Sequence, residues 1–126
     1  MSAVPVETVR AGLRALDRMV RVNPPDRALA LLRTTAAILR NVVDHPDEPK
    51  YAMLRTANKA IANRILAANG GLELLRLAGF RRATRDGDPV LHLSADSRWR
   101  EHIPAVLEWV EGAAHLLEGA AGDGGG

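Results

Sequence analysis

Residues 80–93 have the sequence FRRATRDGDPVLHL, and this stretch separates a mixed α+β chain from an all-helical one. The segments 80–83 and 90–93 flank Asp86-Gly87-Asp88-Pro89, whose residue types favour a tight turn. Two short β-forming runs joined through an Asp-Gly pair are typical of an antiparallel hairpin. We therefore predict a small β-hairpin here, and the sequence carries no second β pattern.

The segments that precede the hairpin have helical patterns. Residues 50–67 form one predicted helix, which must end at Asn69-Gly70-Gly71 because adjacent glycines supply the positive-φ conformations of a helix end. A short helix over residues 72–77 follows and ends at Gly79. We therefore expect the hairpin to emerge directly from a short helix.

Three longer amphipathic helices are predicted over residues 6–20, 25–43 and 98–117, where apolar residues recur every three or four positions. Asn23 is the predicted N-cap of the second helix, with proline at its first position. The side chains that we expect these helices to bury are Val6, Val9, Leu13, Leu16, Met19, Val20, Leu29, Leu32, Ala36, Leu39, Val43, Ile103, Val106, Leu107, Val110, Ala114 and Leu117.

The length and composition indicate one self-supporting domain. The chain has 126 residues, of which 47% are hydrophobic and 25% are charged, as in ordinary globular proteins. Residues 1–118 are the predicted domain, and the glycine-rich residues 119–126 are a predicted flexible tail or linker that leads into something longer. The expected fold class is α+β and predominantly helical.

The same composition argues against several classes of protein. No uncharged apolar run is long enough to span a bilayer, and the first residues lack the apolar core of a secretory signal. Without cysteine the chain has no disulfides or thiolate ligands. The net charge is only +2 and the arginines alternate with acids, so we expect no nucleic-acid binding. A cytoplasmic, or nuclear, protein without membrane attachment is the expectation.

The residue patterns of an active site are missing. The four histidines show no metal-ligand spacing, and no glycine pair is followed by the lysine and hydroxyl residue of a phosphate-binding loop. We therefore expect no catalytic activity, no metal and no cofactor.

Residues 50–64 carry the candidate binding site. On a continuous helix, Tyr51, Arg55 and Asn58 share one narrow strip, which Ala62 continues with a small side chain. An aromatic ring, a guanidinium and a side-chain amide suit an extended peptide that carries carboxylates. Such a strip predicts a site for the backbone and charge of another chain.

Two lysines in the same segment, Lys50 and Lys59, add positive charge near the strip. An acidic, extended peptide is therefore the natural complement of this surface.

Each residue of the strip also has a purely structural interpretation. Tyr51 could cover the edge of the core, Arg55 could pair with Glu48, and Asn58 could cap a break in the helix. Spacing does not choose between these roles and peptide binding.

A set of short motifs between residues 38 and 80 resembles one known family. In chain order the motifs are Ile38-Leu39-Arg40-Asn41, Pro46-Asp47-Glu48-Pro49-Lys50-Tyr51, Leu54-Arg55, Asn58, Arg64-Ile65-Leu66, Gly71, Leu74-Leu75 and Ala78-Gly79-Phe80. Together they are similar to the PUB domain, also called PUG, which occurs in cytosolic peptide:N-glycanase, in some UBX-domain proteins and in a linear-ubiquitin ligase subunit. The resemblance covers about residues 25–115.

The resemblance implies a monomeric adaptor of about five helices with a small antiparallel β-sheet and no catalytic activity. The partner that it implies is the acidic C-terminal tail of the hexameric AAA ATPase called valosin-containing protein, a tail with a tyrosine next to its last residue. Tyr51, Arg55 and Asn58 match the family's groove, while Asn41 matches a residue at its border and Lys50 a basic neighbour. Such an adaptor would serve the ubiquitin–proteasome pathway, through ER-associated degradation or deglycosylation.

Two alternative functions stay open at this point. The domain could be the recruiting part of a larger enzyme such as peptide:N-glycanase, with the chemistry elsewhere. It could also be a basic helical module that binds nucleic acid through its dispersed arginines.

Overall fold

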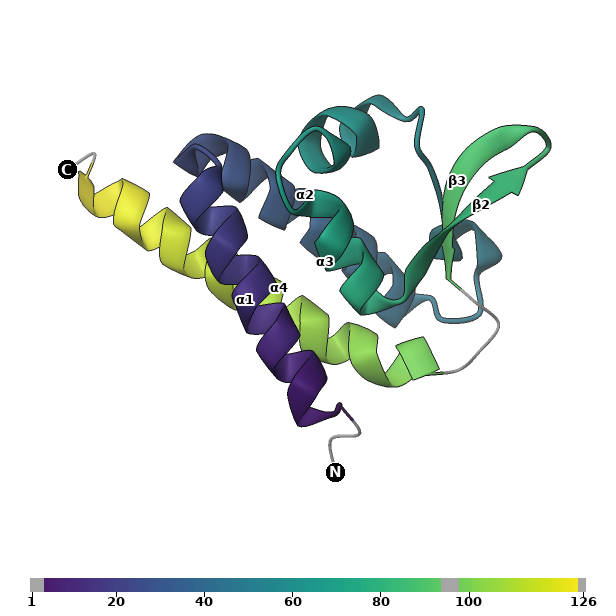
Figure 1. Cartoon of the computed structure of the whole chain (residues 1–126), viewed down its shortest axis with the longest axis horizontal. Coiled ribbons are helices and arrows are strands. Elements are labelled where there is room, and N and C mark those ends of the chain that lie inside the picture. Colours follow the sequence, from purple (N-terminus) through teal and green to yellow (C-terminus); the bar gives the residue numbers. More distant parts are fainter. Residues whose placement is uncertain (1–3, 94–97, 125–126) are drawn as a thin grey trace.

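The computed structural model describes residues 4–93 and 98–124, and it consists of a helical body with a small sheet at one end (Figure 1). The elements in chain order are α1 (Val6–Val22), α2 (Pro25–Asp44), the 3-10 turn η1 (Pro49–Ala52), β1 (Met53–Arg55), the π-helix η2 (Ile61–Leu66), α3 (Gly71–Ala78), β2 (Phe80–Arg85), β3 (Asp88–Leu93) and α4 (Arg98–Gly124). The predicted fold class, α+β and predominantly helical, is confirmed.

The three strands form an antiparallel sheet in the order β1-β3-β2. Strands β2 and β3 are the predicted hairpin, in which only Asp86 and Gly87 separate the paired residues Arg85 and Asp88. Both turn residues have positive φ, 52° and 83°, as the two-residue turn that matches the twist of a hairpin requires. The predicted hairpin is therefore present, and its turn consists of the Asp-Gly pair.

The predicted helix over residues 50–67 is wrong in its first part. The chain makes a 3-10 turn over Pro49–Ala52 and an unpredicted strand over Met53–Arg55, and helical backbone starts only at Lys59. The strand pairs with β3, with Leu54 opposite Leu91. Pairing with a distant strand has outweighed the local helical pattern, which is how tertiary context overrides propensity.

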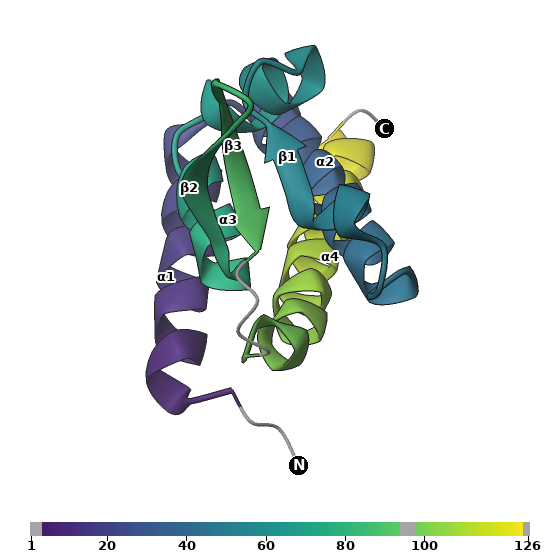
Figure 2. The same ribbon diagram turned by 90° about the vertical axis from the view of Figure 1, so that its right-hand side faces the viewer.

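One hydrophobic core joins the helices to the inner face of the sheet. The ring of Phe80, at the start of β2, is completely buried, and Leu54 of β1 packs against the same core. Figure 2 shows the sheet in front, with α3 and α4 behind it. The largest fully buried side chains are Phe80, Met19, Leu31, Leu32, Leu39, Ile65, Leu74, Leu75, Leu91, Ile103, Val106 and Val110.

Helices α2 and α4 run antiparallel, and two exposed ion pairs join them. Arg33 Nη2 lies 2.9 Å from Glu118 Oε1, and Arg40 pairs with Glu111. The hydrogen bond from Arg40 to Glu111 raises the pKa of this guanidinium above its ordinary value. Since both pairs are solvent-exposed, they align the two helices more than they stabilise them.

The buried face of α1 differs from the predicted one. Val6 and Leu13 are 67% and 55% exposed, whereas Gly12 is buried against the indole of Trp109. A Cβ atom at Gly12 would lie 2.5 Å from a ring carbon of Trp109. Helix α1 therefore approaches α4 through its smallest residue and leaves Val6 and Leu13 exposed, whereas the predicted core residues Leu16 and Met19 are buried.

Two predictions for α2 are also wrong. Val43 is 39% exposed, and its neighbour Val42 is buried in its place. Pro24 is the N-cap residue, whereas Asn23 is buried and bonds to the turn before α3. The amide of Asn23 donates to the carbonyl oxygen of Asn69 at 2.8 Å and accepts from its N–H at 3.1 Å. Asn23 thus joins two loops instead of starting a helix.

Helix α4 continues beyond the predicted end at Leu117, and its backbone is helical to Gly124. The helix therefore extends into the segment expected to be an irregular tail, and the role of residues 119–126 as a linker stays a prediction. No helix in the described ranges is both long enough and apolar enough to cross a bilayer.

Alanine substitution at two glycines should change stability in opposite directions. A Cβ at Gly71 would overlap the backbone carbonyl oxygen of Ile65, so Gly71→Ala should lower the free energy of unfolding by about 1–3 kcal/mol. Gly112, inside α4, has no atom within 4 Å of such a Cβ. Gly112→Ala should therefore raise stability by about 0.5–1 kcal/mol. Urea denaturation followed by circular dichroism measures both, and a neutral Gly71→Ala would show that the turn relaxes freely.

Candidate functional site

An aromatic cluster lies where the end of α2 meets η1. The ring of His45 stacks on the ring of Tyr51, with centroids 5.1 Å apart and planes inclined by 28°, and Lys50 Nζ lies 5.1 Å from the Tyr51 centroid. The backbone N–H of His45 donates to the carbonyl oxygen of Asn41 at 2.9 Å. Tyr51 is half-buried and packs against the core, while His45 and Lys50 are exposed. The structure thus brings the predicted residues Lys50 and Tyr51 together with one unpredicted residue, His45, and links Asn41 to His45 only through a backbone hydrogen bond.

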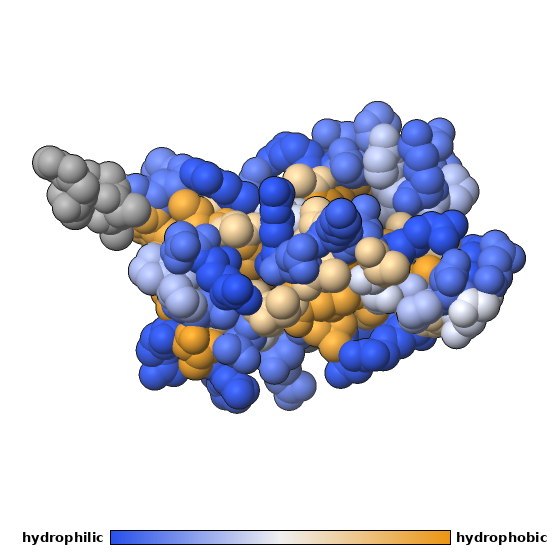
Figure 3. All heavy atoms as spheres, turned by 90° about the horizontal axis from the view of Figure 1, so that it is seen from above, coloured by the Kyte–Doolittle hydropathy of each residue, from blue (hydrophilic) through white to orange (hydrophobic). Residues whose placement is uncertain are grey.

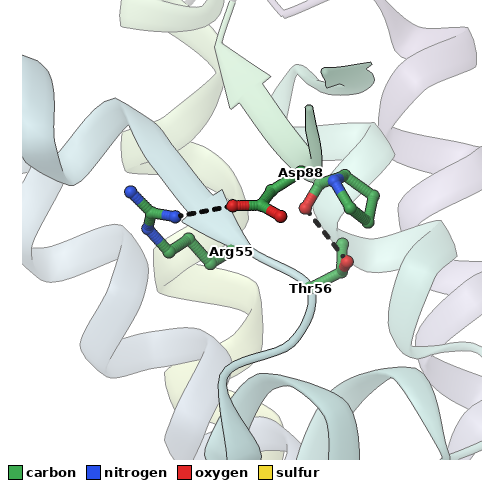
Figure 4. Close-up of polar contacts among 4 residues, drawn as sticks. Arg55, Thr56 and Asp88 are labelled. Carbon is green, nitrogen blue, oxygen red and sulfur yellow. Dashed lines mark hydrogen bonds and ion pairs between the residues drawn. The ribbon is translucent and has the colours of Figure 1, made fainter. Parts of the chain in front are cut away.

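Arg55, the last residue of β1, reaches over the sheet toward the hairpin. Its Nη1 lies 3.4 Å from Asp88 Oδ2, and both side chains are more than half exposed (Figure 4). Next to it, the hydroxyl and the N–H of Thr56 both donate to the carbonyl oxygen of Pro89, at 3.1 and 3.3 Å. The partner considered from the sequence, Glu48, is replaced by a residue of β3. The exposed, long pair with Asp88 leaves the guanidinium open to other anions.

Asn58 caps the helical segment that starts at Lys59. Its Oδ1 accepts the N–H groups of Ala60 and Ile61 at 2.9 and 3.2 Å, as an N-cap side chain does. The capping role considered for Asn58 is therefore confirmed. The capping bonds also fix the orientation of the amide, and its two Nδ2 donors have no partner among the described residues. These donors are available to a carbonyl oxygen of an incoming chain.

The two remaining predicted site residues, Lys59 and Ala62, lie in the helical segment after Asn58. Ala62, in η2, is half-buried, and its N–H donates to the carbonyl oxygen of Asn58 at 2.8 Å. Lys59 is exposed and makes no ion pair or side-chain hydrogen bond within the part of the chain that the structure describes. Lys59 directly follows Asn58 in the chain, and Ala62 is joined to Asn58 by this backbone hydrogen bond.

The predicted single strip on one helix is therefore wrong in its geometry. The site residues form two groups, one around Tyr51 at η1 and one made of Arg55 at the end of β1 and Asn58 shortly after it. Only Met53–Arg55 is extended between them, because Pro49–Ala52 is a 3-10 turn and the N–H of Asn58 donates back to the carbonyl oxygen of Arg55 at 3.1 Å. The two groups therefore do not share one helical face.

The sequence did not reveal two residues that contact the predicted site, His45 and Asp88. The stacking of His45 on Tyr51 depends on how the proline-rich loop between them folds back, which no periodicity reveals. The pairing of Asp88 with Arg55 requires knowledge that β3 lies beside β1. Both contacts come from tertiary structure.

The arrangement offers groups that suit the binding of a peptide. It offers an aromatic surface, an oriented amide donor and an exposed guanidinium, which are groups that recognise a peptide backbone and a carboxylate. In the described ranges, no cluster of three or more His, Asp or Glu side chains could hold a metal ion. Three shallow cavities, of about 300, 340 and 440 Å³, lie elsewhere, beside α1 and α3.

Comparison with known proteins gives two matches. The sequence profile described as the PUB domain matches residues 25–104. The chain is also similar to a UBX domain-containing protein 6 of Caenorhabditis elegans, with 28% identity over 102 residues. This alignment covers 81% of the chain and 22% of the relative, so the chain spans about a fifth of that protein's length.

The cap at Asn58 makes a prediction about stability alone. Asn58→Ala should lower the free energy of unfolding by about 1 kcal/mol, because two N–H groups lose their acceptor. Asn58→Ser keeps an acceptor and should stay within a few tenths of a kcal/mol of the wild type. Chemical denaturation compares the two variants. Equal stability of Asn58→Ala and the wild type would contradict the capping role.

Proposed function

Because the chain belongs to the PUB domain family, a family of protein-interaction domains, we propose that it is a non-catalytic adaptor for the hexameric AAA ATPase called valosin-containing protein. The ligand is the acidic C-terminal tail of that ATPase, bound along the surface that contains Tyr51, Arg55 and Asn58. Its role is to link the ATPase to ubiquitin-dependent, ER-associated degradation or to deglycosylation, in the cytoplasm or nucleus.

One observation carries the proposal. The oriented amide of Asn58 has two free N–H donors, and it lies three residues along the chain from Arg55, whose guanidinium is exposed. An extended peptide presents carbonyl oxygens along its backbone, and an acidic one presents carboxylates as well. Asn58 can therefore donate to the main chain of the tail while Arg55 pairs with a side chain. The amide loses little entropy on binding because its cap has already fixed it.

The aromatic cluster provides the apolar part of the contact. Tyr51 is half-buried, and Lys50 keeps a positive charge beside its ring. The last residues of the tail, which include a tyrosine, can pack against this ring. Because the surface is exposed and its ion pairs are screened by water, we expect affinity in roughly the micromolar range.

The similarity to a UBX domain-containing protein supports the same class of function. A recruiting domain within a larger enzyme is the second arrangement that we considered, and it uses the same surface for the same tail. Nucleic-acid binding is not proposed, because the net charge is only +2 and the family match is to a protein-interaction domain.

The direct test is a calorimetric titration of the domain with a synthetic peptide of the ATPase tail. The wild type should bind in roughly the micromolar range, and Asn58→Ser should weaken binding at least tenfold because it keeps the cap and loses the amide donors. Asn63→Ser, at an exposed asparagine of η2 outside the proposed site, is the matched control and should bind within about twofold of the wild type. Normal binding by Asn58→Ser would show that the tail does not use this surface.

Asp88 should act as an internal competitor for Arg55. The tail must displace the Asp88 carboxylate before its own carboxylate can pair with the guanidinium. Asp88→Asn removes this competition and also removes a negative charge that repels the acidic tail. It should therefore tighten tail binding about two- to fivefold at low salt. The same titration measures the effect. Weaker binding by Asp88→Asn would mean that the pair with Asp88 holds Arg55 in its binding position.

A further inference from the structure

The outer face of the sheet, opposite the core, is rich in arginine. In the sheet, Arg55 of β1 pairs with Val90 of β3, and Val90 pairs with Ala83 of β2. Because paired residues lie on the same side of a sheet and side chains alternate along a strand, this register assigns every strand residue to one face. The core residues Leu54, Leu91 and Phe80 occupy the inner side. The outer face consists of Met53 and Arg55 of β1, Asp88, Val90 and His92 of β3, and Arg81, Ala83 and Arg85 of β2.

This outer face is exposed at its charged residues, whereas Val90 at its centre is only 2% exposed and Met53 and His92 are half-buried. Figure 2 looks onto it, with the helices behind the sheet, and the hairpin end of the molecule has a mostly hydrophilic surface in Figure 3. Arg81, Ala83, Arg85 and Asp88 are all exposed. A ligand that crosses the three strands would therefore pass over the side chains that cover Val90.

The charges on the outer face are unbalanced. It carries three guanidinium groups and one carboxylate, that of Asp88, which pairs with Arg55. Arg81 Nη1 donates to the carbonyl oxygens of Arg76 and Phe80, both at 2.9 Å, so its position is fixed without neutralising its charge. Arg85 makes no ion pair or hydrogen bond with any described residue. Two arginines thus remain without a carboxylate partner.

Charged residues on an edge strand often serve only to prevent pairing with another chain, and β2 is an edge strand. That role does not depend on which side of the strand the charges occupy. The outer face differs because it continues into the proposed tail site through Arg55, which belongs to both surfaces. The shared residue Arg55 and the positive charge of the outer face therefore both indicate that it binds the same acidic tail.

We propose that the outer face binds the acidic residues that precede the terminal residues of the tail. The inference rests on the proposed function and fixes the direction of the peptide. Its upstream acids cross β2 and β3 beside Arg85 and Arg81, a carboxylate meets Arg55, and its last residues reach Tyr51. Neighbouring strands are about 4.8 Å apart, so about three extended residues cross from β1 to β2. The acids concerned lie about three residues upstream of the one that meets Arg55.

The experiment compares two synthetic peptides of the tail, and a third acidic peptide that lacks the terminal residues, by fluorescence anisotropy. The short peptide contains only the last residues of the tail, and the long peptide adds the acidic residues upstream. The wild type should bind the long peptide about five times more tightly at low salt, and added salt should reduce this advantage.

Two variants of the same strand locate the effect. Arg85→Gln should remove about half or more of the advantage of the long peptide and leave binding of the short peptide unchanged. Arg82→Gln is the matched control, because Arg82 is an exposed arginine of β2 on the opposite side from Arg85. It should retain the full advantage of the long peptide.

The outcomes separate this inference from the proposed function. If the wild type binds neither peptide, the proposed function fails. If both peptides bind equally, or if Arg82→Gln loses as much as Arg85→Gln, the outer face is not the upstream site, while the proposed function stands. Equal binding of an acidic peptide without the terminal residues would reveal a nonspecific anion-binding surface and would also overturn the inference.

Discussion

The pairing of β1 with β3 is the contact on which the geometry of the candidate site depends. Leu54 and Leu91 lie opposite each other, and both bury apolar surface in the common core. A three-residue strand has little stability of its own, so it forms because the hairpin offers a free edge and the core accepts Leu54. The chain between Ala52 and Thr56 is consequently extended where its local pattern is helical.

This short strand determines how the polar residues around it are used. It ends at Arg55, whose guanidinium therefore lies over the sheet beside Asp88 instead of on a helix. The two hydrogen bonds from Thr56 to Pro89 then hold the chain as it leaves the sheet. Asn58 follows at the point where helical backbone begins, and it caps this helix. A residue that stabilises the fold is thereby left with two amide donors for a ligand.

The helical body supports this surface without contributing its chemistry. Helices α2 and α4 pack antiparallel, α3 lies behind the sheet, and α1 approaches α4 at Gly12 and Trp109 (Figures 1 and 2). The proposed tail site instead follows the border between the end of α2, η1 and the sheet. Binding residues at such a border are positioned by rigid elements on both sides, which is how a shallow surface can still be selective.

The amino-acid sequence determined the elements that depend on neighbouring residues. The Asp86-Gly87 turn, the helix end at Gly79 and the long amphipathic helices follow from backbone preferences and periodicity, and all are present. The residue types of the candidate site could likewise be named from the motifs. Tertiary structure decided the strand at Met53–Arg55, the exposure of Leu13, the bonding of Asn23 to Asn69, and the contacts of His45 and Asp88. The stacking of His45 on Tyr51 depends on the fold of the loop between them, and the others depend on packing against segments far along the chain. The free energy of such contacts is absent from any local pattern.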